Sequence, residues 1–353
     1  MPASDNNGKK KTSRKRDAAR AGRLSTGRVT LSDVAKVAGV SSMTVSRAIN
    51  RPDSVKPQAL EAVRAAIAET GYVPNMLAGG LASNRTKLIG AIVPTLTHML
   101  FSGSIEAFNS RLSEEGYQVL LGVSGYKQAD DNLVRTILSR CPDGVLLTGT
   151  CHSDEVRRQL LAQDIPIVEG WDLSRPPIDM AVGFSHAAVG RDVARFLIRR
   201  GYENPIVIGA QDERAILRRD AFLAEIIACG LDAALSVDTQ SPSTLEMGRE
   251  SFARLAEQGL SRAAVFCNSD WLAHGVIIEA LARGFRVPED IAVVGFGNLD
   301  FAAYSSPSLT SVRIDRAAIG LHAANMCLAR LKGEEVREKV IDVGFDIVER
   351  QSA

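Results

Sequence analysis

Cysteine is scarce in this sequence, and its placement excludes two common uses of it. The five cysteines are scattered, their number is odd and no two form a CxxC pair; they are Cys141, Cys151, Cys229, Cys267 and Cys327. A disulfide framework needs paired cysteines and a structural zinc site needs closely spaced ligands, so neither is expected. The histidines show no ligand spacing either. We expect no metal and no other cofactor.

Long apolar runs and catalytic signatures are also missing. No stretch approaches the roughly 18 apolar residues of a membrane span, and the N-terminus lacks the apolar segment of a signal peptide. The sequence has no P-loop, no HExxH and no GxSxG, and the GFG at residues 295–297 is too little for a dinucleotide site. We therefore expect a cytoplasmic protein that has no membrane partner and is not an enzyme.

Positive and negative charges nearly cancel over the whole chain, but they are unevenly distributed along it. The formal net charge is only +1, yet residues 1–85 carry 15 Lys and Arg against 6 Asp and Glu, whereas the remainder carries 27 against 35. This asymmetry predicts a polyanionic partner for the first part of the chain alone. Residues 1–28 are polar and hold nine of the basic residues, so we expect a disordered tail that contacts phosphates or only adds solubility.

The stretch TLSDVAKVAGVSSMTVSRAIN, residues 30–50, has the pattern of a helix-turn-helix. Apolar residues recur at spacings of three and four up to Ala38, and Gly39 permits a sharp reversal. Ser41 can cap a second helix, whose Val45 and Ala48 point back at the first. A third helix is predicted at residues 57–70, which gives a headpiece over residues 29–74. The alternative is a two-helix hairpin of some other domain.

The outer face of the second helix is polar, as expected of a helix that lies in a major groove. Arg47 is its strongest candidate for a guanine or phosphate contact. The candidate DNA-binding residues of the headpiece are Thr30, Ser41, Ser42, Met43, Thr44, Ser46, Arg47 and Asn50. We expect the partner to be double-stranded DNA and the protein to associate with the nucleoid.

Residues 75–85 form the predicted hinge between the headpiece and the rest of the chain. Asn75 can cap a short helix, but Gly79 and Gly80 lie inside it and weaken it. Leu81 is then an exposed apolar side chain, a candidate wedge between base pairs in a widened minor groove. A plain flexible linker is the alternative.

From Thr86 onward, short β-branched runs alternate with helical runs. Nine segments have the pattern of strands: LIGAIVPT, YQVLLGVS, GVLLTG, PIVEG, MAVGFS, PIVIGA, ALSVDT, AAVFCN and IAVVGFG. Helices such as residues 187–200 and 269–283 lie between them. This alternation predicts two doubly wound parallel sheets within residues 86–353, with a ligand bound at the carboxyl ends of the strands.

These features together resemble the lactose-repressor family of bacterial regulators, along nearly the whole chain from Val29. The helix-turn-helix, the PNxLAxxLA-type hinge and the alternating core occur in the order of that family. Within it, the chain is most similar to the gluconate-utilisation repressors, through PTLTHMLF, GYK at 125–127, PIVE at 166–169 and DERAILRR at 212–219. The resemblance implies an all-α headpiece and a periplasmic-binding-protein-like core of two doubly wound lobes. It further implies a homodimer on a palindromic operator and a small-molecule effector between the lobes.

The resemblance also carries individual residues over. It assigns base reading to Ser42, Met43 and Arg47, and the hinge to Asn75 and Leu81. It assigns effector binding to Arg218 and Asp270, with Phe101 as an aromatic residue that lines the first lobe. Lobe 1 is expected at about 86–184 and 316–342, and lobe 2 at about 185–315 and 343–353. The chain ends at Ala353 without leucine heptads, so a dimer is preferred to a tetramer.

Chemistry supports the effector residues independently. Asp270 follows the strand AAVFCN, where it can accept from ligand hydroxyls or else cap a helix that starts at Trp271. Arg214 and Arg218 lie four apart on one helical face and can grip a carboxylate. The remaining candidates, on weaker signals, are Tyr126, Lys127 and Glu169. This surplus of cations predicts a polyhydroxy acid such as gluconate, which releases the repressor from DNA. A neutral sugar or a purine is the alternative effector, and a sugar-acid-binding protein or enzyme is the alternative class.

Overall fold

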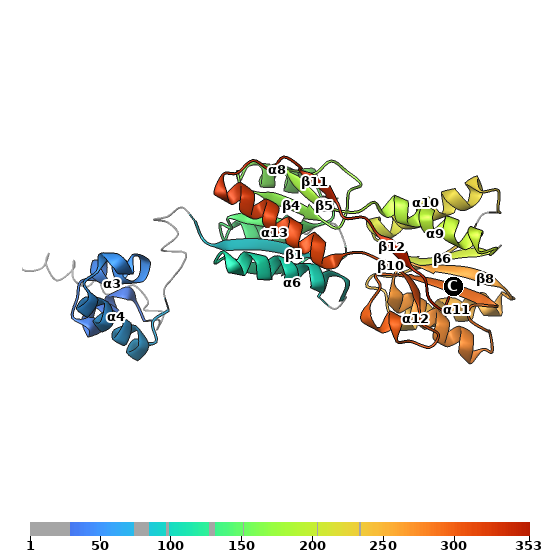
Figure 1. The fold of residues 1–353 in the computed structure, drawn as a ribbon, viewed down its shortest axis with the longest axis horizontal. Coiled ribbons are helices and arrows are strands. Elements are labelled where there is room, and N and C mark those ends of the chain that lie inside the picture. The colour runs from blue at the N-terminus through green and yellow to red at the C-terminus, as the bar shows by residue number, and fades with distance from the viewer. Residues whose placement is uncertain are drawn as a thin grey trace, which may run out of the picture. The chain divides into compact units, whose positions relative to one another are not determined.

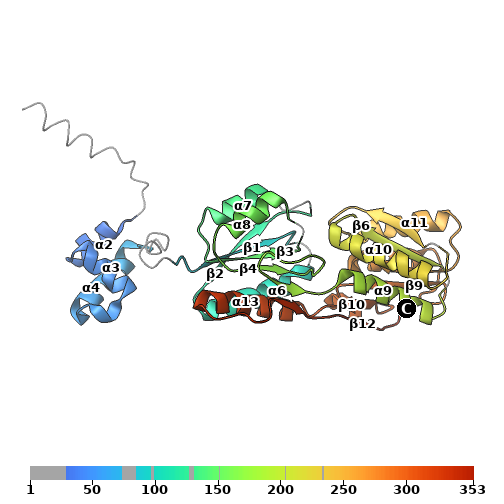
Figure 2. The same ribbon diagram turned by 90° about the horizontal axis from the view of Figure 1, so that it is seen from above.

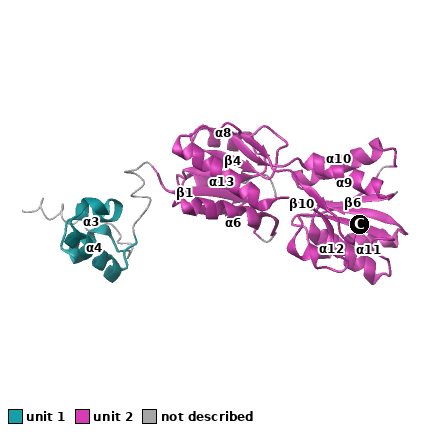
Figure 3. Cartoon of the chain, viewed as in Figure 1, with its two compact units in different colours: residues 1–84 teal, residues 85–353 magenta. Residues whose placement is uncertain are grey.

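The computed structural model describes residues 29–73, 85–96, 99–126, 131–150, 152–202, 204–232 and 234–353. The chain divides into two compact units, Met1–Asn84 and Arg85–Ala353 (Figure 3). The expected basic tail and most of the expected hinge, with Asn75, Leu81 and both hinge glycines, lie outside the described residues, and so does Lys127.

The first unit consists of short helices around a small apolar core. They are α2 (Leu31–Ala38), α3 (Ser42–Asn50), the 3-10 helix η1 (Pro52–Ser54) and α4 (Pro57–Thr70). The side chains buried between them are Val34, Ala35, Val45, Ala48, Val63 and Ala66. The three-helix headpiece expected from the apolar spacing is therefore present.

Local signals set the ends of these helices. The Asp33 carboxylate accepts from the backbone N–H and the hydroxyl of Thr30, at 3.0 and 2.6 Å, which fixes the start of α2. Gly39 ends α2 in the left-handed conformation, at φ 65°, as the sequence predicts. The Ser41 hydroxyl accepts from the Thr44 N–H at 3.2 Å, so the predicted cap of α3 is confirmed.

The second unit contains two six-stranded sheets, one in each lobe. Lobe 1 has the order β11-β5-β4-β3-β1-β2, with β1 (Leu88–Val93), β2 (Gln118–Val123), β3 (Gly144–Thr148), β4 (Ile167–Gly170), β5 (Met180–Gly183) and β11 (Val340–Asp342). Lobe 2 has the order β12-β10-β9-β8-β6-β7, with β6 (Pro205–Ala210), β7 (Leu235–Thr239), β8 (Ala263–Cys267), β9 (Ile291–Phe296), β10 (Thr310–Arg313) and β12 (Asp346–Val348). The two-lobed α/β core is as predicted.

Helices cover both faces of each sheet. In lobe 1, α6 (Met99–Glu114) packs with α13 (Arg316–Lys332) on one face, and α7 (Asp131–Leu138) with α8 (Asp154–Leu161) on the other (Figure 2). In lobe 2, α9 (His186–Arg199) packs with α10 (Glu213–Ala228), opposite α11 (Leu245–Glu257) and α12 (Asp270–Ala282) (Figure 1). A short 3-10 helix, η2 (Asp300–Ala303), follows β9. Strands covered on both sides explain the continuous apolar runs of the sequence.

The strands are parallel except at one edge. β12 pairs antiparallel with β10. The reason is the path of the chain: β10 ends where the chain crosses into lobe 1, β12 begins where it returns, and the two strands lie side by side. The nine strands expected from sequence are present, whereas β10, β11 and β12 were not among them. These three are short and contain polar or charged residues, TSVR, VID and DIV, so they show no continuous apolar run.

No helix in the described ranges is long and apolar enough to cross a bilayer.

Candidate functional site

The outer face of α3 is the candidate DNA-reading surface of the first unit. Ser42, Met43, Arg47 and Asn50 are exposed on it, and Met43 keeps 65% of its surface accessible. The opposite face carries the buried Val45 and is held against the other helices. A small, rigid helix that presents polar side chains on one side is the form in which such helices enter the major groove.

Hydrogen bonds within the headpiece limit what some of the candidates can read. The Asn50 side-chain amide donates to the Ser46 carbonyl at 2.9 Å, which leaves its own oxygen available as an acceptor. Ser41 and Thr44 share a hydrogen bond between their hydroxyls, at 2.9 Å. The Thr30 hydroxyl is engaged by Asp33. Ser41, Thr44 and Thr30 therefore stabilise the helix starts, and Arg47 is left as a long cationic side chain on the surface.

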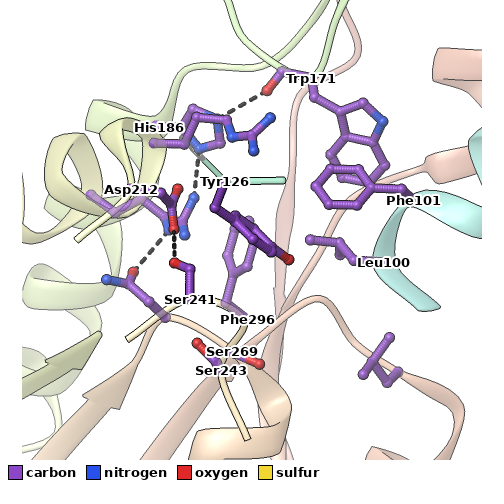
Figure 4. Close-up of a pocket in the computed structure, with 14 residues that line it drawn as sticks. Leu100, Phe101, Tyr126, Trp171, His186, Asp212, Ser241, Ser243, Ser269 and Phe296 are labelled. Carbon is purple, nitrogen blue, oxygen red and sulfur yellow. Dashed lines mark hydrogen bonds between the residues drawn. The ribbon is translucent and has the colours of Figure 1, made fainter. Parts of the chain in front are cut away.

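A pocket in the second unit lies at the carboxyl ends of the strands, between the two lobes. Lobe 1 contributes Leu100, Phe101, Tyr126 and Trp171. Lobe 2 contributes the start of α9 and residues at or after the carboxyl ends of β6 to β9, namely His186, Asp212, Arg214, Arg218, Ser241, Ser243, Asn268, Ser269, Phe296 and Leu299. Figure 4 shows these side chains around the space that they enclose. The parallel sheets thus place the pocket where the sequence predicts a ligand site.

Arg218 of α10 is the centre of the polar part of this pocket. It is 5% exposed, its Nε donates to the Asn268 side-chain oxygen at 2.8 Å, and its Nη1 lies 2.9 Å from His186 Nδ1. Its guanidinium also lies 4.0 Å from the centre of the Phe296 ring. Burial lowers the pKa of Arg218 to about 10, an effect that Asp212 opposes. Arg218 therefore stays a cation at neutral pH.

The protonation of His186 follows from its neighbours. A guanidinium has donors only, so His186 Nδ1 must accept from Arg218. His186 Nε2 then carries the proton and donates to the Trp171 carbonyl at 2.9 Å. Burial, and next the charge of Arg218, hold the pKa of His186 well below its ordinary value. The neutral imidazole thereby links lobe 2 to lobe 1.

Aromatic side chains form the lobe 1 wall of the pocket. The Phe101 and Trp171 rings meet edge to face with their centres 5.0 Å apart. Trp171 Nε1 donates to the Ser104 hydroxyl at 3.0 Å, which fixes the indole. The Trp171 backbone is in the left-handed region, at φ 74°, an uncommon conformation for a bulky residue.

Arg214 reaches across the pocket from the first turn of α10. Its guanidinium lies 5.4 Å from the centre of the Phe101 ring, so a lobe 2 cation rests on a lobe 1 aromatic face. Its Nη1 is buried and has no hydrogen-bond partner among the described residues. Asp212 caps the same helix and accepts from the Ser241 hydroxyl at 3.2 Å. The pocket can therefore bind an anionic molecule that has hydroxyl groups and an apolar face.

Comparisons with known proteins place the chain in a family. Residues 30–75 match the bacterial regulatory proteins of the lacI family, and residues 194–353 match the periplasmic binding protein-like domain. The regulator GntR of Pseudomonas aeruginosa is 40% identical over 331 residues, 93% of this chain and 96% of that protein. The chain belongs to the lacI family.

Other relatives of this lacI-family protein agree. GntR of Escherichia coli K12 is 32% identical and the match spans 91% of this chain and 97% of that regulator. A crystal structure of a family member from Silicibacter pomeroyi is 32% identical and superposes with a TM-score of 0.87, over 92% of this chain and 99% of that one. The chain is thus a DNA-binding, ligand-responsive transcriptional repressor and not an enzyme.

The structure places the predicted effector residues in different surroundings. Phe101, Tyr126, Arg214 and Arg218 line the pocket together. Burial raises the pKa of Tyr126 to about 12, so its hydroxyl stays protonated.

Asp270 is not among the residues that line this pocket. It is fully buried, and its carboxylate accepts from the Leu299 N–H and the Ser311 hydroxyl, both at 2.6 Å. The alternative interpretation as a helix cap is wrong by one residue: α12 begins at Asp270, and Ser269 is the cap, with its hydroxyl accepting from the Trp271 N–H. In the structure, Asp270 ties α12 to the loop after β9.

Glu169 does not line the pocket either. It is fully buried in β4, where one oxygen accepts from the Ile178 N–H and the other lies 3.0 Å from His152 Nε2. The sequence predicts Glu169 as an effector residue. In the structure it could act on a ligand only through His152.

Several pocket residues were missed by the sequence-based prediction. Asn268 and Ser269 come directly after β8, so the rule that ligands bind at strand ends was sufficient to find them. Asp212 follows β6 in the same way. Trp171 comes directly after β4, so the same rule points to it. His186 lies three residues after β5 and gave a weaker signal, because its role depends on contacts with Trp171 and Arg218.

Proposed function

We propose that this repressor responds to a small polyhydroxy acid of the gluconate type, and that the acid releases a homodimer from a palindromic operator. The observation that carries the proposal is the pair of guanidinium groups, Arg214 and Arg218, against a single carboxylate, Asp212, in a pocket that also offers hydroxyls and aromatic rings. The similarity of the sequence to gluconate-utilisation repressors supports the same class of ligand.

Electrostatics favours an acid over a neutral sugar. A carboxylate that enters an enclosed site needs a compensating charge, because burying it unpaired is costly. Arg218 is buried and its charge is balanced within the pocket mainly by Asp212, which itself accepts from Ala215 N–H and the Ser241 hydroxyl. Arg214 adds a second cation with an unsatisfied donor. A neutral sugar would leave this donor without an anionic partner, whereas a carboxylate matches its geometry.

The other lining groups suit a hydroxylated chain. Ser241, Ser243 and Ser269 supply hydroxyls that can both donate and accept. The Phe296 and Trp171 rings offer apolar faces to the C–H groups of such a chain. This combination of a few directed polar groups with aromatic walls is typical of small-molecule sites.

For the DNA partner, we propose that Ser42, Met43 and Arg47 of α3 face the bases of the operator. Their exposure on one face of a capped helix supports this assignment. Asn75 and Leu81 remain proposed for the hinge at residues 75–85, and the lobes are proposed as the core and dimerisation part of the chain. A dimer would place two copies of α3 on two half-sites of a palindrome.

Contacts between the lobes support a coupling between effector and DNA. Arg214 of lobe 2 rests on Phe101 of lobe 1, and His186 connects Arg218 to the Trp171 carbonyl. A ligand that touches both lobes favours one arrangement of them over another, and it shifts DNA affinity by the same coupling energy. Release of the operator is the proposed direction.

Calorimetry and a DNA-release assay on the full-length protein test the proposal. Gluconate is titrated alongside sorbitol, which has the same carbon chain without the acid, and alongside a purine. We expect gluconate alone to bind and to release a DNA site selected in vitro. Tight binding of sorbitol or the purine without gluconate binding would refute the acid and leave the regulator itself unaffected.

A variant pair connects that result to the pocket. Arg218→Ala should lose the response to gluconate, because it removes the central cation. Arg219→Ala changes the same charge one residue away, where the side chain pairs with Asp238 and Asp220 outside the pocket, and it should keep the response. Equal responses of the two variants would contradict the assignment of the pocket.

A further inference from the structure

A second cavity lies beside the effector pocket, on the side of β2 and β3. Residues of lobe 1 after these strands line it, together with the start of α10 from lobe 2. Tyr126, Asp212 and Arg214 line both spaces, so the two cavities are neighbours in the same cleft.

His152 on the lobe 1 wall of this second cavity is buried, and its ring is incompletely paired. Its side chain is 2% exposed, and neither ring nitrogen has a hydrogen-bond partner among the described residues. Glu169 Oε1 lies 3.0 Å from His152 Nε2, within ion-pair distance, so Nδ1 is the ring nitrogen that faces no charged or hydrogen-bonding group among the described residues. Leaving such a group unsatisfied is destabilising, so a ligand group that pairs with it would be stabilising.

Arg214 presents a second unsatisfied donor to the same cavity. Its Nη1 is buried without a partner, and a Cβ atom on Gly149 would lie only 3.6 Å from it. Gly149 has φ +92°, a backbone conformation that residues other than glycine rarely adopt. The glycine after β3 therefore leaves room in front of the Arg214 guanidinium. Arg214 comes from lobe 2 and His152 from lobe 1, so one ligand group between them would join the lobes.

The acidic side chains of this cavity already have partners. Asp172 accepts from the Thr150 hydroxyl at 2.6 Å and from the backbone and hydroxyl of Ser174. Glu213 pairs with Arg175 at 2.7 Å. Because their oxygens are engaged, they oppose a bound anion less than free carboxylates would. Unlike Arg214, the other arginine of the cleft, Arg218, already donates to Asn268 and His186.

We propose that the second cavity is the anion subsite of the effector cleft, in which Arg214 and His152 together bind the carboxylate of the effector. Its hydroxylated chain then extends into the first pocket toward Arg218 and Phe296. Glu169 is a positioning residue, whose carboxylate lies 3.0 Å from His152 Nε2 and fixes the orientation of the ring. This assignment rests on the proposed sugar-acid effector and specifies which end of that molecule meets which lobe.

Two ligands that differ only in charge test the subsite by calorimetry on the full-length protein. Gluconate carries the carboxylate, and gluconamide replaces it with a neutral amide. We expect the wild type to prefer gluconate. Arg214→Met and His152→Gln should each weaken gluconate binding by about 10- to 100-fold, the range for a hydrogen bond to a charged group, while gluconamide binding changes little. The double variant should bind the two ligands about equally.

Matched variants control for the loss of a cation or an imidazole elsewhere. Arg219→Met and His322→Gln alter side chains that do not line either cavity, so both should keep the preference for gluconate. The unfolding midpoint of each variant shows whether it is folded. If His152→Gln does not fold, Arg214→Met still decides, because its side chain is only partly buried.

The outcomes separate the two proposals. A wild type that prefers gluconate, with an unchanged preference in both Arg214→Met and His152→Gln, overturns the subsite and leaves the sugar-acid effector standing. A wild type that binds neither ligand, or that prefers gluconamide, overturns the sugar-acid effector itself. A loss of preference in the variants, with the controls unchanged, supports the subsite.

Discussion

Asp270→Asn separates a structural role of this residue from a ligand role. Asp270 is fully buried and accepts two hydrogen bonds, from the Leu299 N–H and the Ser311 hydroxyl. An asparagine keeps both contacts, because its oxygen can accept from Leu299 and its amide can donate to Ser311. The substitution therefore removes the buried charge and almost nothing else.

The magnitude follows from the pKa of Asp270. Burial raises this pKa from 3.8 to about 6, although the hydrogen bonds from Ser311 and Leu299 oppose the rise. A difference of about two pKa units corresponds to roughly 3 kcal/mol. Because the folded state holds the proton more tightly, the stabilisation is complete below pH 3.8 and is lost as the pH rises through 6. Above pH 6.5 or so, Asp270→Asn should be more stable than the wild type by up to about 3 kcal/mol.

Urea unfolding of both proteins between pH 5 and pH 8, with gluconate titrations at pH 7.5, measures the effect. We expect the stability difference to grow between pH 5 and about pH 6.5 and then to level off. Effector affinity should be unchanged within about threefold, since the carboxylate does not line the pocket. A variant that is less stable at every pH, or one that loses effector binding by tenfold or more, would refute this account and restore Asp270 as a ligand contact.

Two further substitutions test the other parts of the molecule. Arg47→Ala should weaken binding to the selected DNA site by about 1–3 kcal/mol and weaken binding to unrelated DNA much less, whereas Arg64→Ala on the exposed side of α4 should lower the affinity for both DNAs similarly. Gel shifts at fixed salt measure both affinities. Equal losses on the two DNAs in Arg47→Ala would remove Arg47 from base reading. Gly209→Ala would place a Cβ atom 2.1 Å from Asn268 Nδ2, so Asn268 must turn away and Arg218 Nε loses its acceptor. We expect the free energy of unfolding to fall by about 1–3 kcal/mol. An unchanged unfolding midpoint would contradict this expectation.

The parts of the fold that could be predicted are those set by local sequence. The apolar spacing of residues 31–38 and 42–50, the turn at Gly39 and the cap at Ser41 involve neighbours in the chain, and the structure shows each of them. The nine expected strands were found for the same reason, since most of them are buried parallel strands with a continuous apolar run. The antiparallel direction of β12 was not found, because it depends on where the chain crosses between lobes.

The candidate site was predictable only to the level of strand ends. Asp270 follows β8 as expected, but the direction of its side chain depends on the neighbouring strand β9. A Cβ atom on Gly295 would lie 2.3 Å from Asp270 Oδ1, so it is the absence of that side chain which lets the carboxylate turn inward to Leu299 and Ser311. No spacing within the sequence of α12 shows this, because the two residues are 25 positions apart.

The two arginines of the pocket carry the same charge, but the protein already pairs their donors to different extents, so their expected roles differ. Arg218 donates to Asn268 and to His186, and it stacks on Phe296, so its position is fixed before any ligand arrives. Through His186 it also holds the Trp171 carbonyl of the opposite lobe, so a movement of the lobes must alter this contact. Arg214 has a buried donor that the protein does not satisfy. A ligand gains most from the donor that is still free, which is why we expect Arg214 to control the preference for an acid, and Arg218 to control whether ligand binding changes the arrangement of the lobes.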